Sequence, residues 1–230
     1  MITTNVYNRV FFIRGEQYGT AFTVDVGNRQ YLVTARHLLA DPKNTESLLF
    51  LHDNIWKTLL VKVVGVAKGE VDIAVLSPSI RLSPAMSLDA TQKDMVLGQD
   101  VYFVGYPYKM WADMGPLLGG RPAPFIKKGT LSSAFSAEDS ARRLFVDAIN
   151  NEGFSGGPLL FQPQGHQDFR VAGVVAGFKT EYEAVLDECG EKTTMTVAYN
   201  TGFLLAYDIS YVVEMIAANP IGLPIDETAL

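Results

Sequence analysis

Residues 153–160 have the sequence Gly-Phe-Ser-Gly-Gly-Pro-Leu-Leu, in which a glycine-rich turn runs into an apolar stretch. Gly153, Gly156 and Gly157 allow a sharp, sterically open turn, and the Pro-Leu-Leu that follows is typical of a strand. Such a turn places backbone N–H groups beside a serine hydroxyl, which a nucleophilic serine needs in order to bind an oxyanion. Ser155 is therefore a candidate nucleophile, with the N–H groups of Gly153 and Ser155 as a candidate oxyanion hole. A glycine-rich hairpin with an incidental serine has the same pattern and stays an alternative.

Short apolar runs bounded by turn residues extend from this stretch in both directions. Six lie between residues 6 and 78: VYNRVFFIR, TAFTVDV, RQYLVTA, SLLFLHD, TLLVKVVGVA and DIAVLSP. Six more lie between residues 100 and 206: DVYFVGYP, IKKGTLSSA, RLFVDAI, GPLLFQP, FRVAGVVAGF and TMTVAYNTGFLLA. We predict an all-β fold of two six-stranded antiparallel β-barrels, with residues 1–90 forming the first barrel and residues 91–230 the second.

The spacing of apolar residues becomes helical only near the C-terminus. Apolar side chains recur three to four residues apart at Ile209, Val212, Val213 and Ile216. They follow Asp208, a residue type that caps helices, so we expect a short helix at about residues 208–218. We expect this helix to pack on the second barrel. Residues 108–125 and 179–194 are expected to be long loops, which are commonly functional.

Composition excludes several classes of protein. The net charge of −6 is spread along the chain without a basic block, so neither nucleic acid nor an anionic membrane surface is an expected partner. The single cysteine, Cys189, excludes an intramolecular disulfide and a cysteine-rich zinc site, and we expect neither a metal nor a cofactor. No apolar run approaches the ~18 residues of a membrane helix, and the N-terminus lacks the features of a signal peptide. A cytoplasmic location is expected.

A serine hydroxyl needs a base to take its proton, and the chain holds three histidines. His37 follows the apolar run YLVTA, which would place its imidazole at a barrel rim. His52 and His166 fall in stretches expected to be solvated turns. His37 is therefore the candidate base, although a structural role would suit the same position.

The imidazole in turn needs a carboxylate on its far nitrogen. Asp72, at the start of the apolar run DIAVL, is the candidate, with a solvated strand end as the alternative interpretation. Asp25, Asp100 and Asp147 also border strands, so spacing alone does not choose among the four acids.

The order of residues along the chain argues against one serine-hydrolase class. GFSGG satisfies the G-x-S-x-G pattern of α/β-hydrolases, in which an acid and then a histidine follow the serine. Only His166 follows Ser155 here, and the separation is too short for an intervening strand and acid. An esterase of that class is therefore not expected.

His37, Asp72 and Ser155 occur in that order within VTARH, DIAVL and GFSGGP, and these motifs resemble those of the trypsin-like peptidases. The likeness is greatest to the protease domain of bacterial heat-stress (HtrA-type) enzymes. It extends to VYFVGYP, KKGTLSS and NTGFLLAYDISYVVEMI, and covers approximately residues 10–220. The resemblance implies two perpendicular six-stranded barrels, with the active site in the cleft between them. It also implies a serine endopeptidase with these three residues as its catalytic triad.

The resemblance further implies a specificity pocket with Ile149 at its base and Ala176, Gly177 and Gly202 along its walls. Because that base carries no acid, we expect a preference for small or medium apolar residues before the scissile bond. The alternative is that Ile149 simply fills core. Phe154 stands where secreted animal enzymes have an aspartate that binds a newly cut N-terminus, so activation by N-terminal cleavage is not expected.

Two functional readings remain open at this point. The first is an active endopeptidase acting on protein or peptide substrates. The second is a catalytically silent or latent module of the same fold, because fold alone does not guarantee activity. In the latent case, an activating partner would act on the loops at residues 108–125 and 179–194.

Overall fold

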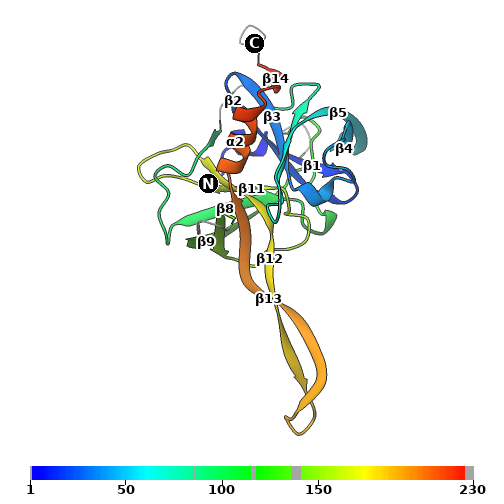
Figure 1. Ribbon diagram of the computed structural model, residues 1–230, viewed down its shortest axis with the longest axis vertical. Coiled ribbons are helices and arrows are strands. Elements are labelled where there is room, and N and C mark those ends of the chain that lie inside the picture. The colour runs from blue at the N-terminus through cyan, green and yellow to red at the C-terminus, as the bar shows by residue number, and fades with distance from the viewer. Residues whose placement is uncertain (1, 85, 87, 115–117, 136–140, 226–230) are drawn as a thin grey trace.

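The computed structural model describes residues 2–84, 86, 88–114, 118–135 and 141–225. Its first unit is a closed ring of six antiparallel strands (Figure 1). The strands are β1 (Val10–Arg14), β2 (Tyr18–Val26), β3 (Arg29–Thr34), β4 (Ser47–His52), β5 (Ile55–Val66) and β6 (Ala74–Pro78). They follow the order β3-β2-β1-β4-β5-β6, and pairing of β3 with β6 closes the ring.

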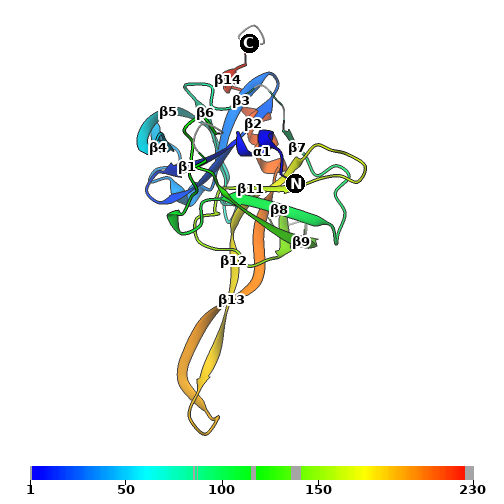
Figure 2. The ribbon, with the colours of Figure 1, turned by 180° about the vertical axis from the view of Figure 1, so that it is seen from behind.

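The second unit is another closed ring of six antiparallel strands, seen from behind in Figure 2. The strands are β8 (Asp100–Gly105), β9 (Phe125–Phe135), β10 (Arg143–Asp147), β11 (Pro158–Phe161), β12 (Arg170–Leu186) and β13 (Lys192–Asp208). They follow the order β11-β8-β9-β10-β13-β12, and pairing of β11 with β12 closes the ring. The predicted all-β fold of two six-stranded antiparallel barrels is therefore confirmed.

Two short strands and four short helical segments complete the described chain. β7 (Asp89–Ala90) runs parallel to β12, and β14 (Leu223–Pro224) pairs with β3. The helical segments are α1 (Thr4–Tyr7), the 3₁₀ turns η1 (Arg36–Leu38) and η2 (Pro107–Lys109), and α2 (Ser210–Ala218). Among the described residues, none of these helices has the length and apolar character needed to cross a membrane.

α2 lies against the first barrel, so the expectation that the C-terminal helix packs on the second barrel was wrong. Its main contacts with other elements are with β5 and β6, while Glu214 also pairs with Arg142, next to β10, at 2.6 Å. Met215 sits over Gly65, where an added Cβ would come within 2.9 Å of its side chain, and Asn219 Nδ2 donates to the carbonyl of Val64 at 2.9 Å. The physical reason is that Gly65 on β5 leaves room for Met215, while Val212 and Ile216 face an apolar core cluster to which both barrels contribute.

The segment at residues 179–194, expected to be a loop, is a β-hairpin. β12 and β13 continue through it and project well away from both barrels (Figures 1 and 2). The segment contains several acidic residues, which suggested a loop, but both faces of the two-stranded ribbon are largely exposed to solvent, where charged side chains are tolerated. The tip is closed by a turn in which Gly190 has φ +82° and donates to the carbonyl of Asp187 at 3.0 Å.

The segment at residues 108–125 is only partly strand-like. It begins in η2 and is held by a bridge between Ala112 and Ala123, whose N–H groups donate to each other's carbonyls at 3.1 and 2.8 Å. Residues 115–117 of this expected loop lie outside the described residues.

Candidate active site

Closure of the first barrel brings His37 and Asp72 together. β3 and β6 are antiparallel and pair Thr34 with Ala74, so the chain just after β3 faces the chain just before β6. His37 lies in η1 after β3, and Asp72 precedes β6. Residues far apart in sequence thereby become neighbours at the barrel rim.

Asp72 holds His37 through two hydrogen bonds. Its Oδ2 lies 2.5 Å from Nδ1 of the imidazole, and its Oδ1 accepts the His37 backbone N–H at 2.9 Å. Burial raises the pKa of Asp72, but the hydrogen bonds from the His37 ring and backbone outweigh it and bring the pKa below its ordinary value. The carboxylate therefore stays ionised at neutral pH, and it leaves Nε2 of the ring as the nitrogen free to take a proton.

The other acids suggested by the sequence lie elsewhere. Asp25 pairs with Arg9 at 2.5 Å, and Asp100 pairs with Lys128 at 2.7 Å. Asp147 is exposed on β10. Of the four candidates, only Asp72 reaches His37.

The remaining histidines are likewise separate from Ser155. His52 Nδ1 contacts Asp53 Oδ2 at 2.7 Å at the end of β4, and His166 is exposed in the connection between β11 and β12. Within the described part of the chain, no three His, Cys, Asp or Glu side chains are grouped so that they could hold a metal ion.

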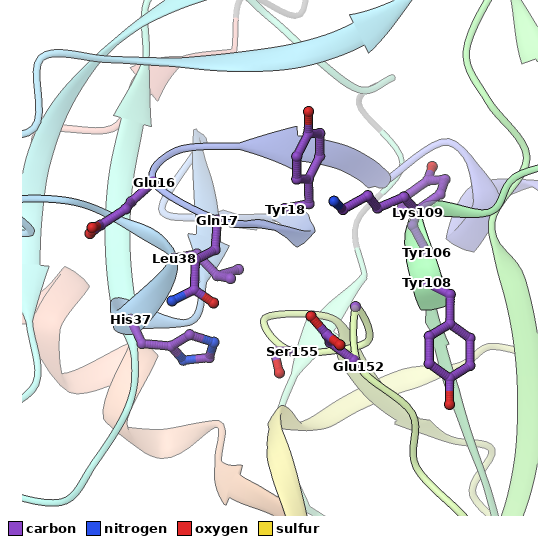
Figure 3. A pocket seen from close by; sticks show the side chains of 11 residues that line it. Glu16, Gln17, Tyr18, His37, Leu38, Tyr106, Tyr108, Lys109, Glu152 and Ser155 are labelled. Atoms are coloured by element: carbon purple, nitrogen blue, oxygen red, sulfur yellow. The ribbon is translucent and has the colours of Figure 1, made fainter.

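Ser155 sits on the second barrel, in the turn that leads into β11. Gly156 N–H donates to the carbonyl of Val175 at 2.8 Å, and Val175 N–H donates back to Gly157 at 2.9 Å, so the turn is tied to β12. The Ser155 hydroxyl donates to the carbonyl of Ala176 at 3.1 Å and makes no hydrogen bond with His37. Figure 3 shows the His37 imidazole and the Ser155 hydroxyl on facing walls of one pocket.

Two backbone N–H groups, those of Gly153 and Ser155, have no acceptor among the described residues. The carbonyl of Glu152 accepts the Tyr108 N–H at 2.9 Å, and the carbonyl of Gly153 accepts the Thr20 hydroxyl at 2.8 Å. In a trans peptide the N–H and the C=O point in opposite directions. The hydrogen bond from Tyr108 to the Glu152 carbonyl therefore turns the N–H of Gly153 away from Tyr108.

Gly153 is required by the conformation of this turn. Its φ is +101°, in the region that side chains disfavour, and a Cβ there would collide with the carbonyl oxygen of Tyr106. Next to it, the ring of Phe154 is fully buried and packs edge-on against Phe103, with centroids 4.9 Å apart. The buried ring of Phe154 thus anchors the turn by apolar packing. An aspartate at this position would instead need a hydrogen-bonding or charged partner.

A cavity of about 550 Å³ opens between His37 and Ser155, on the side of β2 and η2. It is lined by Glu16, Gln17, Tyr18, His37, Leu38, Tyr106, Tyr108, Lys109, Glu152, Gly153 and Ser155 (Figure 3). The Lys109 ammonium lies 4.4 Å from the centre of the Tyr18 ring. Tyr108 and Lys109 have φ of +53° and +62°, so the backbone of two successive residues at this rim is in the left-handed region.

Only some of the residues predicted to form the specificity pocket lie close to Ser155. Ala176 and Gly177 lie on β12 beside Ser155, and Gly202 lies on β13, where its N–H donates to Asn200 Oδ1 at 2.9 Å. Ile149 is 59% exposed, so it neither fills core nor forms the base of a described cavity. The buried residue here is Asn150, whose Nδ2 donates to the carbonyl of Gly177 at 2.9 Å.

Sequence reasoning missed Thr20, Tyr108 and Asn150. Each contacts a segment that is distant in the chain, and none belongs to a motif that the sequence analysis identified. Only the positive φ of Tyr108 is unusual in itself, and the sequence carries no sign of it.

The family of the chain follows from its sequence and agrees with this geometry. The model of the trypsin-like peptidase domain family matches residues 19–167, which is more than half of the chain. The protein belongs to the trypsin-like peptidase domain family. No curated protein matches the chain.

Solved structures with this fold come from several bacterial proteases. The inactive form of the Rv3671c protease, from M. tuberculosis H37Rv, is 19% identical with a TM-score of 0.57, and the match covers 93% of this chain and 90% of that one. The HtrA-type protease AlgW with a tripeptide is 17% identical with a TM-score of 0.58, covering 94% and 61%. The MamO protease domain from Magnetospirillum magneticum is 16% identical with a TM-score of 0.55, covering 93% and 98%. At these identities the likeness establishes the fold alone.

Proposed function

We propose that the protein is a serine endopeptidase that uses Ser155, His37 and Asp72. One observation carries the proposal: the hydrogen-bonded His37–Asp72 pair faces a serine that is flanked by two unpartnered N–H groups. A base, a nucleophile and an oxyanion site within one cleft are the components that acyl transfer needs.

In the proposed reaction, rotation of the Ser155 side chain takes its hydroxyl from the Ala176 carbonyl toward His37. The serine oxygen attacks the peptide carbonyl while Nε2 of His37 accepts the hydroxyl proton, and Asp72 stabilises the resulting imidazolium. The carbonyl oxygen becomes an oxyanion and accepts hydrogen bonds from Gly153 and Ser155. His37 then protonates the leaving amine, and water hydrolyses the acyl-enzyme by the reverse sequence of proton transfers.

The geometry supports an orientation for the substrate. Because His37 must reach the leaving amine, the amine side of the substrate would lie toward the cavity bounded by β2 and η2. The acyl side would lie toward Ala176 and Gly177 on β12. The side chains that flank that region, those of Asn150 and Asn200, are uncharged amides and offer no carboxylate to a basic residue, so we keep the preference for small or medium apolar residues as a proposal. Best cleavage after Arg or Lys in a fluorogenic peptide panel would contradict this preference.

The second candidate is a silent or latent module, because the Ser155 hydroxyl is bonded to Ala176 and not to His37. Apo enzymes often have loose catalytic hydrogen bonds, so this contact alone does not decide between the two. In the latent case, an activating partner would act on residues 108–125 or on the hairpin. The cytoplasmic location expected from the N-terminal sequence stays a prediction.

A fluorophosphonate probe distinguishes the candidates, because it labels only an activated serine. We expect labelling of the wild-type protein, and loss of labelling in Ser155→Ala and in His37→Ala. Ser155→Ala should also lower peptide turnover by about 10⁶-fold. His166→Ala is the matched control and should label normally. Absence of labelling in the wild-type protein would favour the silent or latent module.

A further inference from the structure

The hairpin formed by β12 and β13 projects from the barrels as a two-stranded ribbon whose two faces differ in charge (Figures 1 and 2). In an antiparallel pair, residues directly opposite each other share a face, as do residues two apart along one strand. Tyr182 is opposite Ala198, and Ala184 is opposite Thr196. One face, which we call the uncharged face, is therefore formed by Thr180, Tyr182, Ala184, Leu186, Thr196 and Ala198.

The other face of the ribbon, which we call the charged face, carries Lys179, Glu181 and Glu183. Glu181 is opposite Tyr199 and pairs with Lys179 at 2.8 Å, and Glu183 is opposite Val197. Near the uncharged face, Lys192 adds a charge only at the tip end, opposite Leu186 and beyond an irregularity in the pairing. Depletion of charge from one face is typical of a surface that another protein covers.

The uncharged face also exposes large apolar side chains. The exposed fractions are 69% for Tyr182 and 56% for Leu186. A two-stranded ribbon alone is at best marginally stable in water, and it gains stability when an apolar face is covered by another layer. The described residues of the chain do not supply this layer, since both side chains stay open to solvent.

The shape of the uncharged face is complementary to itself. Along β12 it alternates small and large side chains, in the order Thr180, Tyr182, Ala184 and Leu186. Consider two ribbons stacked face to face in opposite directions, with a two-fold axis level with residue 183. Tyr182 of each copy then lies over Ala184 of the other, and Leu186 lies over Thr180. Large side chains thus meet small ones throughout, as a symmetric interface requires.

Charge favours the same arrangement. Each chain has a net charge of −6, and ribbons stacked in opposite directions hold the two pairs of barrels at opposite ends, where they repel each other least. Ribbons stacked in the same direction would bring the barrels side by side. Contact through the charged face would bury Glu181 and Glu183 of both copies, which costs free energy.

We propose that the uncharged face of the hairpin is a self-association surface, through which two copies of the chain form a symmetric dimer with their ribbons stacked in opposite directions. This inference goes beyond the proposed function, because no step of that reaction uses the uncharged face. One face of a single ribbon is small for a specific interface, so we expect a dissociation constant of about 1–100 µM.

Sedimentation velocity of the full chain tests the dimer. Ser155→Ala protein is used, so that self-cleavage cannot change the sample. We expect a shift from monomer to dimer as the concentration rises from about 1 to about 300 µM, a range that spans the expected dissociation constant. A monomer throughout this range would overturn the proposal and assign the uncharged face to a different partner protein.

Two lysine substitutions locate the interface. Tyr182→Lys places a charge at the centre of the uncharged face, and Val197→Lys makes the same change on the charged face, where Val197 is 54% exposed. We expect Tyr182→Lys to raise the dissociation constant at least about tenfold, because the lysine would be buried without a partner. Val197→Lys should dimerise as the parent does. Thermal unfolding by circular dichroism checks that both variants are folded, and equal effects on dimerisation would overturn the face.

Thiol cross-linking of otherwise unchanged ribbons tests their direction. The single cysteine, Cys189, is exposed at the tip of the hairpin, so in the proposed dimer its two copies lie at opposite ends. A short bismaleimide should therefore not join the dimer through Cys189, and efficient joining there would overturn the arrangement.

A moved cysteine provides the matched positive result. Ala184 lies one residue from the proposed axis, so its two copies are only ~6.6 Å apart along the strand direction. Ala184→Cys in a Cys189→Ser chain should cross-link at concentrations where the dimer forms. Failure of this variant to cross-link while it sediments as a dimer would overturn the register.

Discussion

At the scale of single residues, Asp72 does more than place a negative charge near His37. Its two oxygens bind different parts of the same residue, the ring Nδ1 and the backbone N–H, so the imidazole can neither flip nor move away without losing a hydrogen bond. The ionised form is favoured over the neutral acid despite burial, because both donors stabilise the charge. The orientation of the base therefore depends on this one carboxylate.

Asp72→Asn should destabilise the fold in a pH-dependent way. The pKa of Asp72 is lower in the folded protein, so its contribution to stability is complete above the unfolded-state pKa and is lost as pH falls through the folded-state pKa. At pH 7 we expect a loss of about 1.5–3 kcal/mol in unfolding free energy, the usual value for hydrogen bonds to a charged group. Below about pH 4 the difference from wild type should shrink.

Urea unfolding at neutral and acidic pH measures this effect. Asp147→Asn, in which an exposed strand acid is neutralised, is the control and should change stability little at either pH. A deficit in Asp72→Asn that is the same at both pH values would show that the stabilisation does not come from the charged form.

At the scale of elements, the nucleophile turn is shaped by strands of both barrels. Thr20 on β2 is buried, donates to the Gly153 carbonyl at 2.8 Å and accepts the Tyr106 N–H at 3.2 Å. Thr20 N–H also donates to the carbonyl of Ser155 at 3.0 Å. One residue of the first barrel thus holds the peptides that follow Gly153 and Ser155, each directly adjoining a proposed oxyanion donor, and it is a positioning residue for the proposed oxyanion hole.

Thr20→Val should impair turnover more than substrate binding. Valine keeps the shape of threonine but leaves the Gly153 carbonyl and the Tyr106 N–H unpaired, which should cost about 1–3 kcal/mol of stability. Misplacement of one oxyanion donor should lower kcat by up to ~10²-fold with KM nearly unchanged. Thr20→Ser, which retains the hydroxyl, should restore kcat. Steady-state kinetics well below the melting temperature are the measurement, and equal changes in Thr20→Ser and Thr20→Val would argue against the hydrogen bond.

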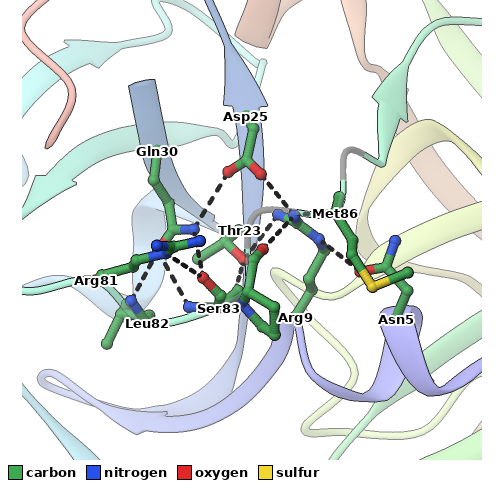
Figure 4. A network of polar contacts seen from close by, with 10 residues as sticks. Asn5, Arg9, Thr23, Asp25, Gln30, Arg81, Leu82, Ser83 and Met86 are labelled. Carbon is green, nitrogen blue, oxygen red and sulfur yellow. Dashed lines mark hydrogen bonds and ion pairs between the residues drawn. The ribbon is translucent and has the colours of Figure 1, made fainter. Parts of the chain in front are cut away.

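At the scale of the whole molecule, the site exists only if the two barrels keep their relative position. A polar network fixes the segment that connects the barrels to the first of them (Figure 4). Arg9 is fully buried, pairs with Asp25 at 2.5 Å, and donates to the carbonyls of Pro84 and Met86 in the connection. Gln30 accepts the N–H of Leu82 at 2.7 Å in the same segment.

Arg9→Met should strongly destabilise the protein. The substitution leaves Asp25, only 9% exposed, as a nearly buried carboxylate without its partner, so we expect a loss of about 3–5 kcal/mol. Lys128→Met removes a surface partner from Asp100 and should cost no more than about 1 kcal/mol. Chemical denaturation compares the two variants, and equal losses would show that the buried network has no special role.

Much of the fold could be predicted because strand positions are encoded locally. Apolar runs such as DVYFVGYP and turn residues between them marked most strands of both rings, and the family resemblance is confirmed by the match to residues 19–167. The hairpin was misassigned as a loop because both of its faces are exposed. The packing of α2 was misassigned because its apolar stripe suits either barrel, and only the space above Gly65 decides between them.

The sequence by itself determined most strand positions, the all-β class and the serine in its glycine turn, because these depend on neighbouring residues. Spacing left four strand-bordering aspartates equivalent and only the family resemblance favoured Asp72; the pairing of β3 with β6 is what brings that acid to His37. Tertiary structure alone decided the contact of Thr20 with Gly153, which are 133 residues apart, and the exposure of Ile149. Contacts of this kind depend on how distant segments pack, and no local pattern encodes them.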